Sequence, residues 1–360
     1  MNTLGTSYRI TSIGESHGKV VGVVIDGCPA GLELDMEKLQ ADLDRRRPGQ
    51  SSVSTTRNEA DKAEVLTGLY QGVTTGAPIT IIIRNRDRDS SKYLEARWTP
   101  RPGHADYTAG IRYGEKQDPR GGGRFSGRNT AGFVIAGAVA KQLLDSIGAN
   151  IIAYTYQIGS VMAKDVDQVI VTESNIVRCP DESAAQEMIR VIDEARSEGD
   201  SVGGKVKVVV LTPPSGIGHP IFDTLEGDIA KALYAIPAVK AVEFGVGVGY
   251  AEMRGSEAND QYIIRDGKVV TVTNNSGGIL GGISSGMPIE ATVTFKPTPS
   301  IGMEQKTVDL QRMEETTIKV EGRHDPCIVP RAVPVVEAMM AVVLADHALR
   351  AGLIPQVLGE

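Results

Sequence analysis

The chain has 360 residues, of which 41% are hydrophobic and 23% are charged, and this composition is ordinary for a soluble globular protein. Its net charge of −7 argues against general nucleic-acid binding, which needs a basic surface. The three cysteines are far apart and odd in number, which argues against a disulfide framework or a zinc knuckle. No signal peptide is visible, and the longest apolar run, residues 131–140, is too short to span a bilayer. We expect a cytoplasmic protein that binds neither nucleic acid nor membranes.

The first part of the chain predicts strands on both sides of one amphipathic helix. Asp35 is the expected helix N-cap, and Pro48 is its expected stop. The flanking apolar runs predict strands at residues 8–13, 20–26 and 78–84.

Residues 85–128 show no clear periodicity and are rich in Gly, Pro, Arg, Asp and His. Their embedded Tyr and Trp residues argue against disorder, so we expect a long functional loop. An apolar helix at 130–147 follows and should be buried, because it is apolar nearly all round. The remaining predicted elements are helices at 182–199, 223–236 and 333–349, strands at 205–211 and 289–295, and a hairpin about Asp266–Gly267.

Strands and helices are mixed without regular βαβ alternation, which favours an α+β fold. No linker divides the chain, so we expect one domain over residues 1–360. Arginine-containing loops precede two apolar helices, in "RGGGRFSGR" and "EGRHDPCIVPR". This weak echo is consistent with an internal duplication.

The stretch "GESHG" at residues 14–18 matches the G-x-S-x-G pattern of a hydrolase nucleophile elbow, with Ser16 as the nucleophile. An elbow needs a helix after the serine, whereas β-branched residues follow here. A polar turn between two antiparallel strands explains the glycines equally well. It leaves the close grouping of Glu15, Ser16 and His17 unexplained.

Three histidines lie in glycine-containing loops beside arginines or carboxylates: His17, His104 and His324. Any one of them reads as a surface histidine, but three with similar neighbours favour a shared site. His104 with Asp106, and His324 with Asp325, are suitable metal ligands. Flanking arginines at positions 101 and 323 disfavour a metal unless an anion lies between them.

Arginines gather in "DRRRPG" at 44–49 and in "DPRGGGRFSGRNT" at 118–130. The first cluster lies at a helix C-terminus, where cations are common. The second places three glycines and Arg124, Ser126 and Arg128 before a helix N-terminus, which resembles an anion cradle. It is neither a Walker A loop nor a dinucleotide fingerprint. The residues therefore indicate an enzyme for a small, multiply anionic substrate, with histidines and a carboxylate as acid–base groups.

Seven motifs in order, "GESHG", "DRRRPGQS", "RPGHADYT", "RGGGRFSGR", "GGILGGISSG", "KPTPS" and "GRHDPC", resemble those of the chorismate synthase family. The resemblance runs from Gly14 to Cys327 and implies a β-α-β sandwich, in which antiparallel sheets enclose helices. It implies anti-1,4-elimination of phosphate and a ring proton from 5-enolpyruvylshikimate 3-phosphate, giving chorismate. It also implies a homotetramer that depends on reduced FMN, with NADPH or a separate reductase as the source of electrons.

The resemblance also assigns roles to individual residues. His17 matches the histidine beside the substrate phosphate, His104 the one that protonates reduced flavin, and Asp325 the carboxylate that assists removal of the ring proton. Ser16 matches a substrate hydrogen-bond donor. The matching substrate-binding arginines are Arg46, Arg101, Arg128 and Arg323. The matching cofactor-binding residues are Arg46, Ser52, Arg124, Phe125, Ser126, Pro237, Ala238, Gly281, Lys296, Pro297, Thr298, Pro299, Ser300 and Arg323.

Two positions depart from the family pattern. Ser52 stands where many relatives have an arginine, and Pro237 stands where some have a polar residue. These departures put a nucleotide or phosphate contact and a flavin hydrogen bond in question. Two other functions stay open at this stage: a flavin- or phosphometabolite-binding protein without catalysis, and a hydrolase that uses Ser16.

Overall fold

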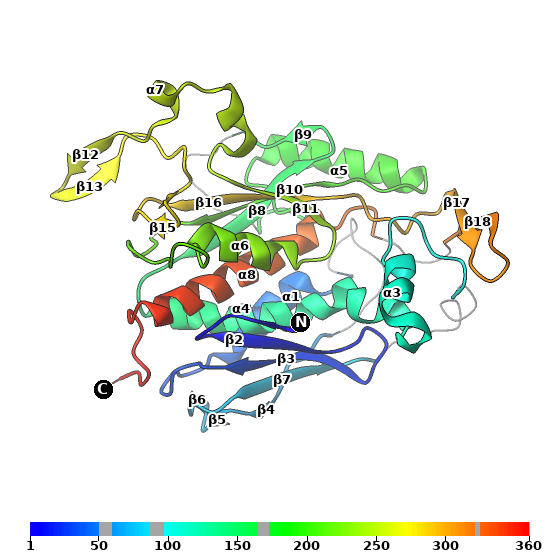
Figure 1. Ribbon diagram of the computed structural model, residues 1–360, viewed down its shortest axis with the longest axis horizontal. Helices are drawn as coiled ribbons and strands as arrows, with labels where there is room; N and C mark the ends of the chain where they lie inside the picture. Colours follow the sequence, from blue (N-terminus) through cyan, green and yellow to red (C-terminus); the bar gives the residue numbers. More distant parts are fainter. Residues whose placement is uncertain (50–59, 87–96, 165–172, 321–324, 360) are drawn as a thin grey trace.

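Two five-stranded sheets and the helices between them form the body of the protein in the computed structural model, which describes residues 1–49, 60–86, 97–164, 173–320 and 325–359 (Figure 1). The first sheet has the order β1 (Thr3–Leu4), β2 (Arg9–Gly14), β3 (Val20–Asp26), β7 (Ile79–Arg84), β4 (Glu64–Thr67). The second has the order β11 (Val239–Phe244), β16 (Ile289–Phe295), β10 (Gly204–Val210), β8 (Ile151–Ile158), β9 (Val161–Met162). Neighbouring strands are antiparallel throughout both sheets.

Helices α4, α6 and α8 lie between the sheets, and α5 covers the outer face of the second sheet (Figure 1). The helices are α1 (Met36–Arg46), α3 (Asp106–Tyr113), α4 (Thr130–Asp145), α5 (Glu182–Ser197), α6 (Leu225–Tyr234), α7 (Gly255–Ala258) and α8 (Val329–Arg350). Short 3-10 turns are η1 (Gly114–Lys116), η2 (Arg120–Phe125), η3 (Gly127–Asn129) and η4 (Gly247–Glu252). Four small hairpins complete the fold: β5 (Leu69–Tyr70) with β6 (Val73–Thr74), β12 (Tyr262–Arg265) with β13 (Lys268–Thr271), β14 (Ile279–Leu280) with β15 (Ile283–Ser284), and β17 (Glu304–Asp309) with β18 (Glu314–Lys319).

The prediction of mixed helices and strands is confirmed, and most local signals lie where the structure needs them. Asp35 caps α1 by accepting hydrogen bonds from the N–H groups of Glu37 and Lys38. The predicted hairpin turn has Asp266 and Gly267 both at positive φ, as a two-residue turn of this kind requires. The internal duplication stays a prediction.

Two boundaries differ from the sequence prediction. The last helix begins at Val329 and not at residue 333. Pro330 is compatible with this start because the N–H groups of the first helical turn have no partner within the helix, so a proline there costs no hydrogen bond. The stretch predicted as a loop contains α3 and the three turns η1–η3. These segments are too short to show a helical period.

Helix α8 is the centre of the core: every residue in it is buried except Arg331 and Arg350. Among the described residues it is the one helix long and apolar enough to cross a membrane, and that window is fully buried. Near its C-terminal end, Asp346 accepts hydrogen bonds from the backbone N–H groups of Thr6, Ser7 and Tyr8 at 2.9, 2.5 and 2.8 Å. A buried carboxylate therefore joins the first sheet to the central helix.

Helix α4 passes close to its neighbours because it carries glycines at two contacts. A Cβ on Gly137 would lie 2.3 Å from the Cα of Ala338 in α8. A Cβ on Gly132 would lie 2.5 Å from the carbonyl oxygen of Gly22 in β3. These glycines let the helix lie directly against both the sheet and α8.

We expect Gly137→Ala to lower the free energy of unfolding by up to about 2 kcal/mol. The clash with the α8 backbone costs about 1–3 kcal/mol, which outweighs the gain of about 1 kcal/mol in helix propensity. Urea unfolding of the variant measures this loss. The matched control is Gly255→Ala, because an added Cβ there meets nothing within 4 Å. Equal stability of the two variants would contradict the close crossing.

A buried ion pair joins α1 to α8. The guanidinium of Arg45 donates two hydrogen bonds to the Glu337 carboxylate, at 2.6 and 2.9 Å. Burial raises the pKa of Glu337, but Arg45 and Lys141 more than offset this and hold it below its ordinary value of 4.5. The stability that Glu337 contributes is therefore present above pH 4.5 and is lost as the pH falls through the depressed pKa of the folded state.

We expect Glu337→Gln to cost about 1–3 kcal/mol of stability at pH 7, because it replaces a buried charged acceptor of Arg45 by a neutral one, while Arg45 keeps its other two carboxylate partners. This difference from the unsubstituted protein should shrink as the pH falls below 4.5. Urea unfolding at pH 7 and near pH 4 measures both values. Glu314→Gln, at an exposed carboxylate, is the control and should change neither. A difference that stays constant with pH would contradict the linkage.

Candidate active site

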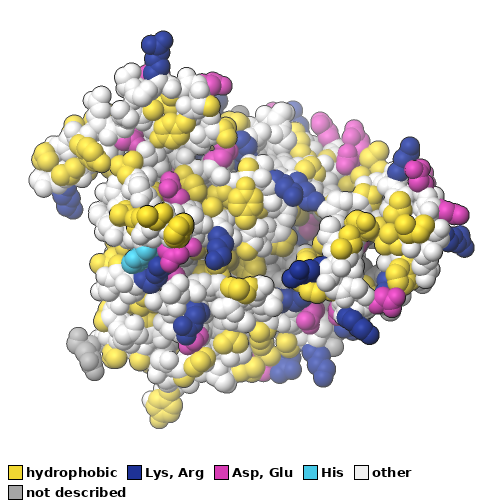
Figure 2. Space-filling model, in the orientation of Figure 1, with side chains coloured by type: hydrophobic (Ala, Val, Ile, Leu, Met, Phe, Trp, Pro, Cys, Tyr) yellow, Lys and Arg dark blue, Asp and Glu magenta, His cyan; other side chains and the backbone are white. Residues whose placement is uncertain are grey.

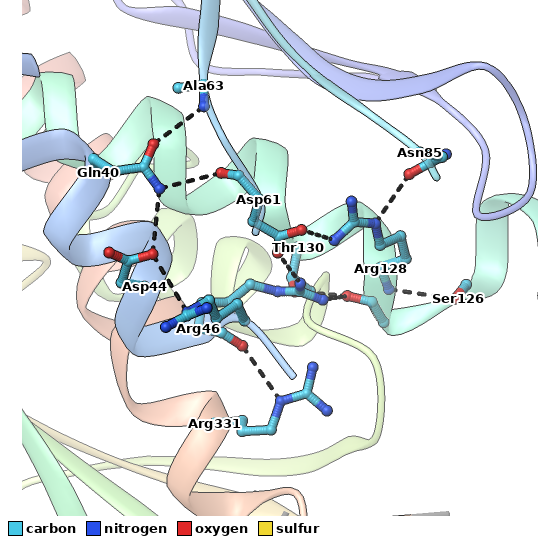
Figure 3. Close-up of polar contacts among 12 residues, drawn as sticks. Gln40, Asp44, Arg46, Asp61, Ala63, Asn85, Ser126, Arg128, Thr130 and Arg331 are labelled. Atoms are coloured by element: carbon cyan, nitrogen blue, oxygen red, sulfur yellow. Dashed lines mark hydrogen bonds and ion pairs between the residues drawn. The ribbon is translucent and has the colours of Figure 1, made fainter. Parts of the chain in front are cut away.

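The two arginine clusters meet at one buried carboxylate, that of Asp61 (Figure 3). Arg46, at the end of α1, donates from Nη1 to one oxygen of Asp61 at 3.1 Å. Arg128, in η3 before α4, donates from Nη1 to the other oxygen. All three side chains are at least nine-tenths buried. The carboxylate thus bridges two guanidiniums that are 82 residues apart in sequence.

Each of the three guanidinium nitrogens of Arg46 donates a hydrogen bond. Its Nε donates to Thr130 Oγ1 at 3.1 Å, and its Nη2 donates to the carbonyl of Gly127 at 2.9 Å. Burial, and then the nearby charge of Arg331, lower the pKa of Arg46 to about 9, although Asp61 opposes this. One carboxylate, that of Asp61, pairs with two buried guanidiniums, so this group carries a net positive charge, which favours an anion.

Arg331, at the start of α8, adds a third guanidinium and brings Asp325 to the same place. Its Nε donates to the backbone carbonyl of Arg46 at 3.3 Å, and its Nη1 pairs with the Asp325 carboxylate. The predicted residue Asp325 therefore lies beside the arginine cluster, on the loop that leads into α8.

The "GESHG" turn packs against the glycine-rich loop. Ser16 and His17 are both buried, and Ser16 Oγ lies 3.2 Å from Ser126 Oγ. The ring of His17 lies against Gly121, because a Cβ on that glycine would be 2.2 Å from His17 Cδ2. Since β3 pairs with β2 directly after this turn, Ser16 has no following helix and is not in a nucleophile elbow.

The backbone conformation of the loop at residues 121–123 requires glycine. Gly121, Gly122 and Gly123 all have positive φ, at 61°, 79° and 51°, which other residues rarely adopt. Arg124 is directed back to β2, where its guanidinium donates to the carbonyls of Gly14 and Ser12 at 2.7 and 3.3 Å. The next residue, the predicted cofactor contact Phe125, is 48% exposed.

Asn85 connects the turn to the arginine cluster. Its side-chain nitrogen donates to the carbonyls of Glu15 and Gly18 at 3.1 and 3.0 Å. Its side-chain oxygen accepts from Arg128 Nε at 3.1 Å. One amide at the end of β7 therefore sets the position of His17 relative to Arg128.

A second group of predicted residues gathers around His104. Its Nε2 lies 2.7 Å from Ser300 Oγ, 196 residues away. Lys296 Nζ donates to the carbonyl of Gly103 at 2.5 Å, and Arg101 forms a two-point pair with Asp106 at 2.8 and 2.9 Å. Burial raises the pKa of Asp106, but the hydrogen bonds from Arg101 outweigh it and hold that pKa below its ordinary value. The "RPGHAD" and "KPTPS" motifs therefore form one structure.

Residues 201 and 202 join the two groups. Ser201 Oγ donates to the carbonyl of Thr298 at 2.7 Å. The N–H of Val202 donates to the carbonyl of Pro326, next to Asp325, at 2.8 Å. Residues 201 and 202 therefore contact both the segment Lys296–Ser300 and the loop that contains Asp325.

The remaining predicted residues have different placements. Ala238, after Pro237, accepts from the N–H of Lys296 at 3.0 Å and so adjoins the His104 group. Gly281 lies in the turn of the β14–β15 hairpin, which contacts the start of α6 through Leu225 N–H to Gly282 O at 2.9 Å. Ser52, Arg323 and the third loop histidine, His324, lie outside the described residues.

The sequence prediction missed three residues of the cluster: Asp61, Asn85 and Arg331. Asn85 follows a predicted strand directly, and Arg331 is part of the second arginine loop, so both left a signal in the sequence. Asp61 left none. The residues with described positions contain no group of three or more His, Cys, Asp or Glu side chains able to hold an ion, and His324 of the metal alternative is not among them.

Comparison with known proteins identifies the arrangement. The sequence profile of chorismate synthase matches residues 8–349. The chain is 55% identical over 364 residues to a chorismate synthase of Methanothermobacter thermautotrophicus, covering 100% of this chain and 97% of that one. It is 51% identical to one of Dehalococcoides mccartyi, with 100% of both chains covered. A crystal structure of chorismate synthase superposes with a TM-score of 0.74 at 32% identity, over 96% of this chain and 93% of that chain.

Proposed function

The chain belongs to the chorismate synthase family of lyases, and from this premise we propose that it eliminates phosphate and a ring proton, anti-1,4, from 5-enolpyruvylshikimate 3-phosphate. The observation that carries the proposal is the buried arginine cluster beside His17. A substrate with one phosphate and two carboxylates needs several cations in fixed positions. Arg46, Arg128 and Arg331 meet that requirement at one end of the helix layer.

Departure of phosphate generates negative charge on the leaving oxygens. Guanidiniums in a water-poor site stabilise such charge strongly, because they are already oriented before the reaction begins. His17, held against Gly121 beside this cluster, would donate a proton or a hydrogen bond to the leaving phosphate. Ser16 would donate a hydrogen bond to the substrate from the same turn.

Reduced FMN, when bound, supplies the electron-rich group needed to remove a ring proton that is not acidic. The His104 group fits such a ligand, because the Thr298 hydroxyl is buried and has no hydrogen-bond partner among the residues whose positions are described. We propose that Arg124, Phe125, Ser126, Pro237, Ala238 and Lys296–Ser300 hold it. The assignment of Gly281, and that of NADPH as direct reductant, stay predictions.

His104 and Asp325 are each oriented by a neighbour. Ser300 Oγ lies 2.7 Å from Nε2 of His104 and so fixes the orientation of the imidazole, a group that can exchange a proton near neutral pH. Arg331 forms an ion pair with the Asp325 carboxylate and holds it near the N-terminus of α8. We propose that His104 protonates reduced flavin and that Asp325 assists removal of the ring proton, as the family resemblance implies.

We also propose a cytoplasmic homotetramer. Figure 2 shows hydrophobic side chains gathered on the protruding β12–β13 hairpin. Tyr262, Ile264 and Val269 there are 65%, 71% and 62% exposed. An apolar hairpin of this kind is typical of a surface that is covered in an assembly.

The test is an anaerobic assay of purified protein with reduced FMN and substrate, in which phosphate release and chorismate absorbance are both followed. His17→Ala should lower kcat at least about 100-fold, because general acid catalysis contributes that much or more. Ser16→Ala should keep activity within about tenfold, since one neutral hydrogen bond is lost. His219→Ala, on the loop before α6, is the matched control and should be unaffected. Absence of both products with the unsubstituted protein would refute the proposed function.

A further inference from the structure

We propose that Asp61 is a positioning residue, which fixes Arg46 and Arg128 as one preformed binding unit for the phosphate of the substrate. This inference rests on the proposed function and extends it to a residue outside the predicted motifs. Asp61 does not itself touch the anion in this proposal. It acts through the two arginines that it bridges (Figure 3).

The hydrogen-bond geometry sets both guanidiniums at once. Each oxygen of Asp61 accepts from a different arginine, so neither guanidinium can turn without giving up its bond to the carboxylate. The Asp61 side chain is 0% exposed, and water therefore does not compete for these oxygens. Arginine side chains have many rotamers, and ordering them before the substrate arrives removes that cost from binding.

The backbone around Asp61 is itself fixed by α1. Gln40 donates from Nε2 to the carbonyl of Asp61 at 3.3 Å and accepts from the N–H of Ala63 at 3.1 Å. Asp61 has φ of 42°, in the left-handed region that Asp and Asn tolerate better than most residues. An Asp61→Asn substitution therefore keeps the backbone and the side-chain shape while removing the charge and one acceptor.

Two effects of that substitution oppose each other. Loss of a negative charge strengthens the attraction of the cluster for an anion. Loss of one acceptor turns an amide N–H₂ group toward a guanidinium and releases that arginine from its position. We infer that the second effect dominates. The Asp61 side chain bridges two donors, and Asn cannot accept from both because an N–H₂ group replaces one of the two oxygens.

The experiment measures inorganic phosphate binding to the full-length protein by titration calorimetry in a phosphate-free buffer. Asp61→Asn should raise the Kd for phosphate at least about tenfold, which is the loss of one charge-assisted hydrogen bond. In the steady-state assay the same variant should raise KM by a similar factor and change kcat less. A uniform loss of folded protein would lower kcat alone and leave KM and Kd unchanged.

Gln40→Ala tests the positioning of Asp61 separately from its charge. It loosens the backbone at Asp61 but leaves every charge of the cluster in place. We expect about a threefold rise in Kd, and this variant also provides the test if Asp61→Asn does not fold. Glu337→Gln is the matched control, because it breaks a buried carboxylate–arginine pair outside the cluster and should leave the Kd for phosphate unchanged.

Phosphate binding by Asp61→Asn that is equal to or tighter than that of the unsubstituted protein would overturn the proposal. So would an unchanged Kd in Gln40→Ala, or no phosphate binding by the unsubstituted protein. These outcomes are independent of catalysis. Absence of chorismate formation would refute the proposed function, while the phosphate titration would still decide whether Asp61 organises an anion site.

Discussion

The burial of arginine side chains around a single carboxylate is the constraint on which the site depends. A guanidinium taken out of water must be paired and hydrogen-bonded, and Asp61 does this for Arg46 and Arg128 together. Asp61 and Asp325 are the two carboxylates paired with the three guanidiniums of the cluster, so positive charge is still in excess. An excess of positive charge in a buried cluster favours the binding of a multiply charged anion.

The packing of the helices puts these charges in one place. Arg46 ends α1, Arg128 precedes α4 and Arg331 begins α8. Because α4 and α8 cross with their backbones nearly in contact at Gly137, their N-terminal ends stay at fixed positions relative to each other. The stability of the core and the geometry of the site are therefore linked through the same helices.

The loops add the acid–base groups to this rigid base. Asn85 ties the turn of His17 to Arg128, and Ser300 orients His104. Neither histidine lies on a helix or strand, so each takes its position from hydrogen bonds with distant segments. This arrangement explains why no single motif is sufficient for the proposed chemistry.

The sequence alone determined the mixed fold class, the cap of α1 by Asp35, the glycine-rich loop and the family, because these follow from local propensity and from residue order. Only the tertiary structure decided that one carboxylate, Asp61, bridges Arg46 and Arg128. Its stretch carries no motif, and its role comes from burial and from contacts 15 and 67 residues away in the chain. Burial and long-range pairing are properties of the packed chain, and local sequence does not encode them.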